Sequence, residues 1–392
     1  MTWPIVIDKG SPKHRLWQVV GYALLAGAIF WVAYRFQNYQ LLNFARAAAD
    51  AVAILGLMII IGYSGQVSIG QSFFFGLGAY VTAWLGVDHG WNFLLTLPVS
   101  AAIGMAIGFL VGIPALRIRG LYLALVTLAL AAVFPVLAKL EVMQSITGGA
   151  NGKPADDIIW TTPGWVPGSP SNQAWQFLVL CAVGAVLFIL ASNMMKSRPG
   201  RNLIALRDSE VGAAVSGVWP AGWKTGAFAI SAAYGALGGS MLVFVTRIAA
   251  PETGGFATAI ALLTGAVLGG LGTISGAVVG ALAVTFVPYY TNEFMAGDGF
   301  LFIPASDRPR DFLIFQGGDG PILAGALYGV LLIAVVFVMP GGIIYFVRLM
   351  RSKLIRFVPK LPDVSAPRRD EPSPAELEPA GAIIQPRGGE PA

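Results

Sequence analysis

Charged side chains are scarce in this chain of 392 residues: Asp, Glu, Lys and Arg make up 11%, whereas hydrophobic residues make up 56%. An ordinary soluble domain carries about twice that charged fraction. The apolar residues fall in runs of roughly 20, which is the length that one helix needs to cross the hydrocarbon core of a bilayer. The composition therefore excludes an ordinary soluble domain and predicts a membrane protein.

Cysteine and histidine are nearly absent as well. Cys181 is the single cysteine and lies within an apolar run, so the chain can form neither an internal disulfide nor a cysteine-rich zinc site. The two histidines, His14 and His89, have no cysteine or pair of acidic residues near them in the sequence, so we expect no metal site. This scarcity of histidine and cysteine leaves few candidates for a nucleophile-base pair or for metal ligands, which argues against a membrane-embedded enzyme.

No nucleotide-binding motif is present. A phosphate-binding loop needs the pattern G-x-x-x-x-G-K-[ST], and neither Gly222-Trp-Lys-Thr225 nor Gly152-Lys-Pro154 has it. The glycines from Gly270 to Gly276 lie in an apolar run and lack the spacing of a dinucleotide fingerprint. We therefore expect a non-catalytic chain that binds no cofactor of its own.

The apolar runs predict an all-α membrane protein, a polytopic helical bundle of about ten transmembrane spans. The spans are expected at residues 17–34, 45–62, 67–87, 93–116, 120–138, 174–195, 225–246, 256–273, 275–290 and 320–338. The chain has 49 glycines, many of them inside these runs, where they let helix backbones approach closely. In the third, eighth and ninth spans their density leaves broken or re-entrant helices open as an alternative.

The distribution of positive charge predicts which side the loops face. With both termini in the cytoplasm (N-in/C-in), most of the 25 Lys and Arg residues fall in cytoplasmic segments, including Arg117, Arg119 and the cluster at 196–207. The net charge of +5 therefore follows membrane sidedness and requires no nucleic-acid partner. Arg46 and Asp50 are expected near the outer end of the second span, so the middles of the spans hold no ionisable residue. A proton-coupled carrier usually has an ionisable residue near the bilayer midplane, so the sequence argues against a carrier of this class.

Three regions follow from this arrangement. Residues 1–16 form a cytoplasmic N-terminal arm, and residues 17–347 form the transmembrane domain, which includes a cytoplasmic segment at 196–224. Residues 348–392 are rich in Pro, Glu and Arg and poor in apolar side chains, so we expect a disordered cytoplasmic tail.

A polar stretch interrupts the apolar background between Gly62 and Tyr80. Its side chains and small residues offer hydrogen-bond donors and acceptors without charge, and such groups must find partners inside the bundle or line a wet cavity. We take Ser64, Gly65, Gln66 and Ser68 as candidate residues of a translocation path. Hydrogen bonding between closely packed helices explains the same residues equally well.

A second polar cluster, Thr147-Gly-Gly-Ala-Asn-Gly152, follows the fifth span in a predicted outer loop. Adjacent glycines allow backbone conformations closed to other residues, so backbone amides there could point at a solute carboxylate. The candidate path therefore also includes Thr147, Gly148, Gly149 and Asn151 of this loop. Thr127, in the fifth span, is added to it as a further uncharged polar side chain. An ordinary turn beside a helix end is the simpler interpretation of the loop.

The third stretch, residues 198–218, predicts a short amphipathic helix between the sixth and seventh spans. Leu203, Leu206, Val211 and Val215 recur near helical spacing. On the cytoplasmic side such a helix could dock in a groove of a partner protein and transmit motion to the spans on either side of it. A helix that only anchors the loop in lipid headgroups has the same periodicity.

Taken in order, these stretches resemble the inner-membrane permease subunits of branched-chain amino-acid ABC importers, of the LivM type. The resemblance rests on Ser64-Gly-Gln66, Phe75–Tyr80, Pro114–Leu128, Thr147–Gly152, Gly200-Arg201 with Arg207–Glu210, and Val267–Gly272. It implies a heteromeric importer in a bacterial inner membrane. Its other parts would be a second permease subunit, two cytoplasmic ATPases that bind ATP and Mg, and an extracytoplasmic solute-binding protein.

The resemblance also implies that the 200–218 segment couples to an ATPase. The residues that it assigns to this coupling are Gly200, Arg201, Leu203, Leu206, Arg207, Asp208, Glu210 and Gly217. Arg207, Asp208 and Glu210 would face the ATPase, while Leu203 and Leu206 would fill its groove.

The expected function is therefore that of a permease subunit that moves branched-chain, hydrophobic amino acids across the inner membrane by alternating access, along a path lined by uncharged residues. A urea or short-amide importer is the nearest alternative, because nothing in these motifs separates the two. An ion-coupled secondary transporter is the alternative from another class.

Overall fold

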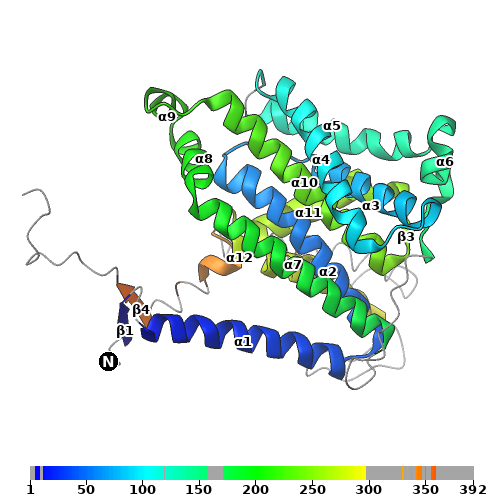
Figure 1. Ribbon diagram of the computed structural model, residues 1–392, viewed down its shortest axis with the longest axis horizontal. Helices are drawn as coiled ribbons and strands as arrows, with labels where there is room; N and C mark the ends of the chain where they lie inside the picture. Colours follow the sequence, from blue (N-terminus) through cyan, green and yellow to red (C-terminus); the bar gives the residue numbers. More distant parts are fainter. Residues whose placement is uncertain are drawn as a thin grey trace, which may run out of the picture. The chain divides into compact units, whose positions relative to one another are not determined.

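The computed structural model of the chain is largely helical (Figure 1). It describes residues 5–8, 12–118, 120–156, 171–296, 329, 330, 333, 337, 341–346, 349 and 355–358. The chain divides into two compact units, Met1–Gly21 with Ser352–Ala392, and Tyr22–Arg351. Each unit is described by itself below.

In the smaller unit, two short strands pair in parallel. β1 (Ile5–Asp8) lies beside β4 (Ile355–Val358), with Ile5 opposite Ile355. β4 falls within the tail that was expected to be disordered, so that expectation is wrong for residues 355–358. The physical reason is local, because Ile355, Phe357 and Val358 are residue types that favour a strand.

The larger unit is the helical bundle that the apolar runs predict. Its long helices are α1 (Pro12–Arg35, which begins in the smaller unit), α2 (Asn38–Leu57), α3 (Gln71–Asp88), α4 (Phe93–Ala115), α5 (Leu121–Ala138), α7 (Asn172–Lys196), α10 (Pro220–Thr246), α11 (Phe256–Gly269) and α12 (Ile274–Ala296). The short helices are α6 (Gln144–Thr147), α8 (Arg198–Asp208) and α9 (Glu210–Val215). A π-helix, η1 (Met58–Tyr63), continues α2.

Shorter elements connect the helices. There are 3-10 turns at η2 (Glu141–Met143), η3 (Gly149–Asn151) and η5 (Pro251–Gly254), and β2 (Lys153–Pro154) pairs antiparallel with β3 (Ile248–Ala249). Among the described residues, six helices are long and apolar enough to cross a membrane: Asn38–Tyr63, α4, α5, α7, α10 and Ile274–Thr291. This confirms the helical membrane fold. The expected tenth span, 320–338, lies largely outside the described residues, so the count of ten stays a prediction.

The core of the bundle is made by α2, α3 and α10. In the most apolar stretch of α10, 94% of the residues are buried inside the chain, against 22% in α7 and in α12. A helix that is apolar on all sides but mostly exposed suits contact with lipid, whereas α10 is enclosed by protein. The bundle is therefore organised around one buried helix.

Close backbone contact with α3 makes that burial possible. A Cβ atom on Gly78 of α3 would overlap the backbone of Ala236 in α10, and one on Gly239 of α10 would overlap the backbone of Phe75 in α3. Small residues are the usual means by which membrane helices approach this closely.

A buried amide joins all three core helices. The Gln71 Nε2 group in α3 donates to the Ala53 carbonyl in α2 and to the Ser231 carbonyl in α10, both at 3.0 Å. The Ser231 hydroxyl in turn donates to the Gly56 carbonyl at 2.8 Å. Gly56 has no room for a side chain, since a Cβ there would overlap the Gln71 amide. The network satisfies polar groups that have no water available.

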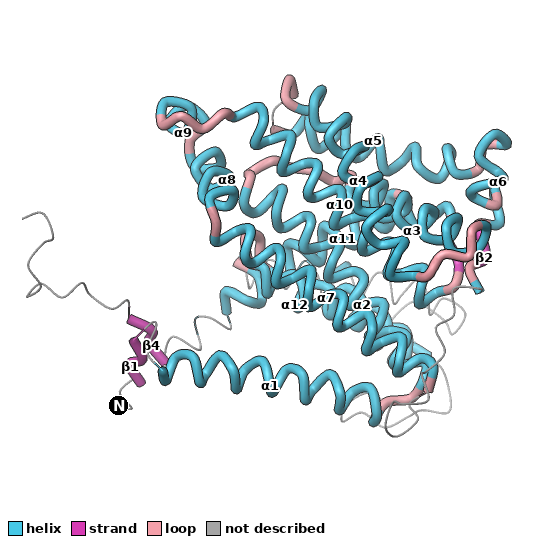
Figure 2. The backbone as a smooth tube through the Cα atoms, in the orientation of Figure 1, coloured by secondary structure: helices cyan, strands magenta, loops and turns pink. Residues whose placement is uncertain are grey.

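The bundle has two ends that differ in structure (Figure 2). We call the end that carries Gly62, α8, α9 and Gly272 the coupling end, and the end that carries Asp88, residues 139–154 and β3 the loop end. Segments expected in the cytoplasm meet at the coupling end, where Arg207 bonds to Gly62 and Gln66 bonds to Lys224. Segments that the span order puts on one side of the membrane therefore lie together at one end of the bundle. Which end faces the cytoplasm stays a prediction.

Of the broken or re-entrant helices that glycine density left open, the structure shows a broken one at η5 and α11. η5 runs from the loop end into the bundle, where the Ser72 hydroxyl in α3 donates to the Gly254 carbonyl at 3.0 Å. α11 then has only 14 residues, about 21 Å at 1.5 Å per residue, which is less than the hydrocarbon thickness. α3 is also preceded by a non-helical stretch that begins at Ser64.

Replacing Gly78 or Gly239 with Ala should destabilise the bundle, because the added methyl group meets backbone atoms that cannot move aside. We expect a loss of about 1–3 kcal/mol in the free energy of unfolding. Gly226→Ala in α10 is the matched control, since nothing lies within 4 Å of a Cβ at that position. Thermal unfolding in detergent measures both, and equal midpoints for Gly78→Ala and Gly226→Ala would contradict the packing described.

Candidate functional site

A cavity of about 640 Å³ opens among α2, α3, η5, α10, α11 and α12. Its volume lies within the range of small-molecule pockets in proteins, about 300–1,000 Å³. The polar lining comes from Asn43, Arg46, Asp50, Glu252, Thr253, Thr258 and Thr285, and the apolar lining includes Phe75, Leu242, Leu262 and Val284. Both charge signs and an apolar wall therefore meet in one space.

Asp50 is the deepest charged residue of this cavity. Its relative exposure is 9%, and its Oδ2 atom accepts a hydrogen bond from the Thr285 hydroxyl of α12 at 3.3 Å. Arg46 lies one helical turn earlier on α2 and is exposed. The two positions therefore share one face of the helix.

The structure corrects the expected position of Asp50. α2 begins at Asn38 rather than near residue 45, because Gln37 and Gln40 form a capping box at its start. The apolar helix then runs from Asn38 to Tyr63, and Asp50 lies at its middle rather than near its outer end. The expectation that the span middles hold no ionisable residue is therefore wrong.

Glu252, at the η5 turn, also lines the cavity. Its carboxylate pairs with Lys139 at 2.9 Å, and the two side chains are 72% and 43% exposed. The charge of Glu252 is therefore already balanced by a partner from the end of α5.

Tight glycine packing lies between the cavity and the coupling end. A Cβ on Gly265 of α11 would lie 2.5 Å from Ile54 Cδ1, and one on Gly280 of α12 would overlap the backbone of Gly265. Further along, Gly62 leaves no room for a Cβ against the backbone of Gly272. We call this close contact, on the coupling-end side of the cavity, the closure.

The predicted amphipathic helix at 198–218 is two helices, which corrects the sequence expectation. α8 ends at Asp208, and Ser209 begins α9 by accepting a hydrogen bond from the Gly212 backbone amide at 3.1 Å. Serine is a favoured N-cap, so this residue starts a second helix instead of continuing the first.

The two leucines of α8 are buried inside this chain. Leu203 is 2% and Leu206 4% exposed, with α8 packed against α7 and α10. Gly200 is buried with them, and a Cβ there would overlap the backbone of Met195. The expectation that Leu203 and Leu206 fill a groove of an ATPase is therefore wrong, because they anchor α8 to the bundle.

Arg207 connects α8 to the end of α2. Its Nη1 atom donates to the Gly62 carbonyl at 2.8 Å, and the guanidinium also pairs with Asp208 at 3.2 Å. Glu210 pairs with Lys224 of α10 at 2.6 Å. Of the charged residues expected to face an ATPase, Arg207 and Glu210 thus make contacts within this chain.

Periodicity did not reveal the apolar surface that α9 and Trp219, the residue before α10, expose. Val211 is 75%, Val215 85% and Trp219 71% exposed. Val211 and Val215 are four residues apart, so they lie on one face of α9. Periodicity marked both as apolar but could not show that they point away from the bundle. Gly217, between α9 and α10, has a positive φ of 82°.

The first group of candidate path residues lies at the coupling end and outside the cavity. Gln66 Nε2 donates to the Ser64 hydroxyl at 2.6 Å and to the Lys224 carbonyl at 3.1 Å, and Thr127 Oγ1 accepts from the Ile69 amide at 2.9 Å. Ser64 and Ser68 are buried, and Gly65 contacts Arg207 with a φ of 71°. The hydrogen bonds of Ser64, Gln66 and Thr127 join the non-helical stretch before α3 to the rest of the bundle.

The second group lies at the loop end. The Thr147 hydroxyl donates to the Ala138 carbonyl at 2.7 Å, and Gly148 and Gly149 both have positive φ angles. Asn151 is exposed. The structure thus places the candidate path residues at two separate ends, and none of them lines the cavity.

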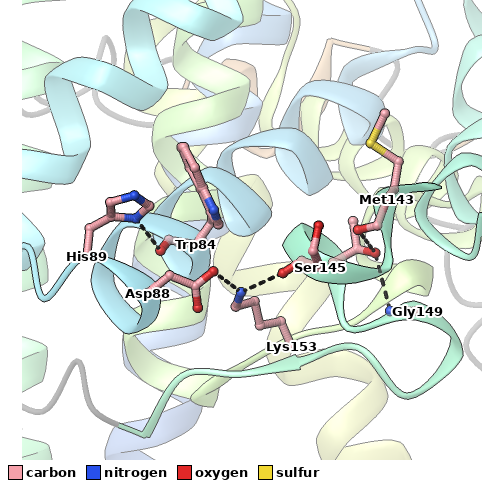
Figure 3. Close-up of polar contacts among 8 residues, drawn as sticks. Trp84, Asp88, His89, Met143, Ser145, Gly149 and Lys153 are labelled. Carbon is pink, nitrogen blue, oxygen red and sulfur yellow. Dashed lines mark hydrogen bonds and ion pairs between the residues drawn. The ribbon is translucent and has the colours of Figure 1, made fainter. Parts of the chain in front are cut away.

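A lysine holds this loop in place (Figure 3). Lys153 Nζ lies 2.6 Å from the Asp88 carboxylate at the end of α3 and donates to the Ser145 carbonyl at 3.2 Å. The Lys153 side chain is only 9% exposed. The glycines let the loop turn back far enough for this contact. Within the described part of the chain, no three His, Cys, Asp or Glu side chains are placed to hold a metal ion.

Comparison with known proteins gives consistent matches. Residues 40–339 match the family described as branched-chain amino acid transport system / permease component. The chain is 32% identical over 303 residues to the high-affinity branched-chain amino acid transport system permease protein LivM of Escherichia coli (strain K12), covering 70% of this chain and 68% of that protein.

Other relatives are similar over comparable lengths. LivM of Salmonella typhimurium is 32% identical over 247 residues, 58% of each chain. The autoinducer 2 import system permease protein LsrC of Yersinia enterocolitica is 28% identical over 293 residues, which is 70% of this chain and 76% of that protein. No solved structure matches the chain.

Replacing Lys153 with Met should loosen the loop end, because it removes the cation from a largely buried ion pair and leaves Asp88 without it. We expect a loss of about 1–3 kcal/mol in the free energy of unfolding, together with faster proteolysis of the 139–156 loop. Lys139→Met is the matched control, since its pair with Glu252 is exposed and contributes less than about 1 kcal/mol. Equal effects of the two variants on the unfolding midpoint would refute this role for Lys153.

Proposed function

Because the chain belongs to the family of branched-chain amino acid transport permease components, we propose that it is the membrane-spanning subunit of an ATP-driven importer for branched-chain or other hydrophobic amino acids. It works in a bacterial inner membrane. The observation that carries this proposal is at the coupling end, where α9 exposes apolar side chains and the preceding helix, α8, is bonded to the end of α2 through Arg207. This is the arrangement that a subunit driven by a separate motor needs.

An importer of this kind needs partner proteins beside this chain. Two cytoplasmic ATPases bind ATP and Mg and supply energy, a second permease subunit completes the membrane path as a heterodimer, and a solute-binding protein delivers the solute at the loop end. This chain carries no phosphate-binding loop of its own. In this proposal it supplies the path and the coupling segment, 196–224, without catalysing a reaction.

Val211, Val215 and Trp219 form the docking surface for an ATPase in this proposal, in place of the buried leucines. Their exposed side chains are an apolar face of the kind that a helix lays into a groove of a partner. Asp208 is exposed beside them and can contact the groove's rim. Gly200, Leu203 and Leu206 hold α8 rigid, so that force on α9 reaches the bundle.

Arg207 transmits that force. The described conformation has a cavity toward the loop end and tight packing at Gly62 and Gly272 beneath it. Alternating access requires that this closure open in another state. Movement of α8 would pull on the Gly62 carbonyl through Arg207, at the end of a π-helix, an element often found where helices change shape for function.

The relatives leave the solute open, since LivM is named for branched-chain amino acids and LsrC for autoinducer 2. The higher identity to LivM and the presence of both charge signs in the cavity support an amino acid. The direct test is uptake by the reconstituted transporter with its ATPases and binding protein. Amino-acid uptake by this chain alone, driven by an ion gradient and independent of ATPase, would contradict the proposal.

Replacing Val215 with Asp should weaken the attachment of the ATPases, because a charge on the docking surface is costly to bury. We expect at least a ten-fold loss of ATPase recovered with the permease from detergent, and a parallel loss of uptake. Val142→Asp is the matched control, since Val142 is equally exposed, at 85%, but lies at the loop end. ATPase recovery that is unchanged in Val215→Asp would favour a helix that only rests in lipid headgroups.

Replacing Arg207 with Met should uncouple ATP hydrolysis from transport while the ATPases stay attached, because the link to Gly62 is lost but the surface of α9 remains. We expect uptake to fall at least ten-fold with ATPase activity largely retained. Arg198→Met, an exposed arginine at the start of α8, is the control and should keep the wild-type ratio of uptake to hydrolysis. If Arg207→Met keeps that ratio too, Arg207 does not transmit force.

A further inference from the structure

We propose that Arg46 and Asp50 of α2 bind the head group of a zwitterionic amino acid inside the cavity of about 640 Å³ described above, Arg46 taking its carboxylate and Asp50 its ammonium group. The inference rests on the proposed import function and adds to it a recognition site within this chain. It also replaces the expectation of an uncharged path by one that carries a matched pair of charges.

The first support is the state of the Asp50 carboxylate. It is 91% buried in the middle of an apolar helix, and the hydrogen bond from Thr285 is long, at 3.3 Å. A carboxylate in such a place is costly unless a cation or several donors compensate it. No ion pair joins Asp50 to Arg46, and no second side chain among the described residues donates to it. An ammonium group, with three donors, would supply what is missing.

The second support is the position of Arg46. It lies one turn from Asp50 on the same face of α2 and lines the same cavity, but it is exposed and makes no ion pair within the described part of the chain. A guanidinium group presents a planar fork of donors that matches a carboxylate. An α-amino acid carries its carboxylate and ammonium on one carbon, so it can engage both residues at once.

The remaining charge of the cavity does not compete for the solute. Glu252 also lines the cavity, but its carboxylate is paired with Lys139 at 2.9 Å. That leaves Arg46 and Asp50, which attract each other but form no ion pair, to face a ligand. This arrangement suits a molecule with no net charge and two opposite charges. A neutral amide, urea or sugar-like solute would leave both uncompensated.

Part of the cavity lining is apolar. Phe75, Leu242, Leu262 and Val284 contribute to it, from four different helices. Pockets of this kind take up an apolar body and fix its orientation through a few polar groups. The site therefore fits an amino acid with an aliphatic side chain, with its head group at α2 and its side chain toward α10, α11 and α12.

The test measures direct binding of L-leucine to the complete transporter in lipid nanodiscs, without the binding protein, and compares it with two competitors. L-leucinol lacks the carboxylate, and 4-methylpentanoate lacks the ammonium group. Wild type should prefer L-leucine to either compound at least ten-fold. Arg46→Gln should remove the preference over L-leucinol only, and Asp50→Asn the preference over 4-methylpentanoate only.

Glu252→Gln is the control variant within the same cavity and should keep both preferences. If Arg46 or Asp50 had a purely structural role, its replacement would weaken the binding of all three compounds equally. This outcome would overturn the proposal. The proposal would also be overturned if both variants kept the preference for L-leucine. It would be overturned as well if a transporter that imports L-leucine with its binding protein showed no detectable L-leucine binding in this assay. A wild-type transporter that imports no amino acid would instead contradict the proposed function.

Discussion

The amide of Gln71 is the contact on which the arrangement of this bundle depends. It donates to carbonyl groups of α2 and α10 from its place on α3, at a depth where no water can replace a lost hydrogen bond. Because Gly56, Gly235 and the Ser231 hydroxyl surround it, the three helices can meet at this level in one register only. That register fixes Asp50 on one side of the contact and Gly62 on the other. The Gln71 contact thus lies between Asp50 in the cavity and Gly62 at the coupling end, both on α2 and its continuation η1.

The coupling end is joined to this central contact through α8. α8 is anchored by buried leucines and contacts the end of α2 through Arg207, while α9 stays outside with its apolar face exposed. In the proposed transporter, a displacement of α9 by an ATPase would be passed on to the place where Gly62 meets Gly272. Close glycine contacts of this kind have few intermediate arrangements, since backbone atoms either touch or separate. The closure is therefore suited to open and shut as a unit.

Much of the fold could be predicted from the sequence, and the failures have physical reasons. The apolar runs predicted the helices of the bundle, and the ordered motifs predicted the family. The start of α2 was misplaced because Asn38, Gln40 and Asn43 are polar, although the Gln37 and Gln40 capping box marks it. The break at Ser209 also had a local signal, since serine is a common N-cap. Periodicity alone could not tell which stripe of α8 and α9 faces the protein, so Leu203 and Leu206 were given the role that suits Val211 and Val215. The cavity was beyond prediction, because it joins residues as far apart as Arg46, Thr258 and Thr285, and only the packing of η5 and α11 brings them together.

In the proposed transporter, the closure between Gly62 and Gly272 responds to the ATPases through α8. Distances between spin labels at Tyr63 and Leu271, with Cys181 replaced by Ala, measure it most directly in the assembled transporter. Pulsed electron resonance should find two distance populations, whose ratio changes between the nucleotide-free and the ATP-trapped states and no longer changes when Arg207 is replaced by Met. A single distance that is the same in both nucleotide states would contradict the account.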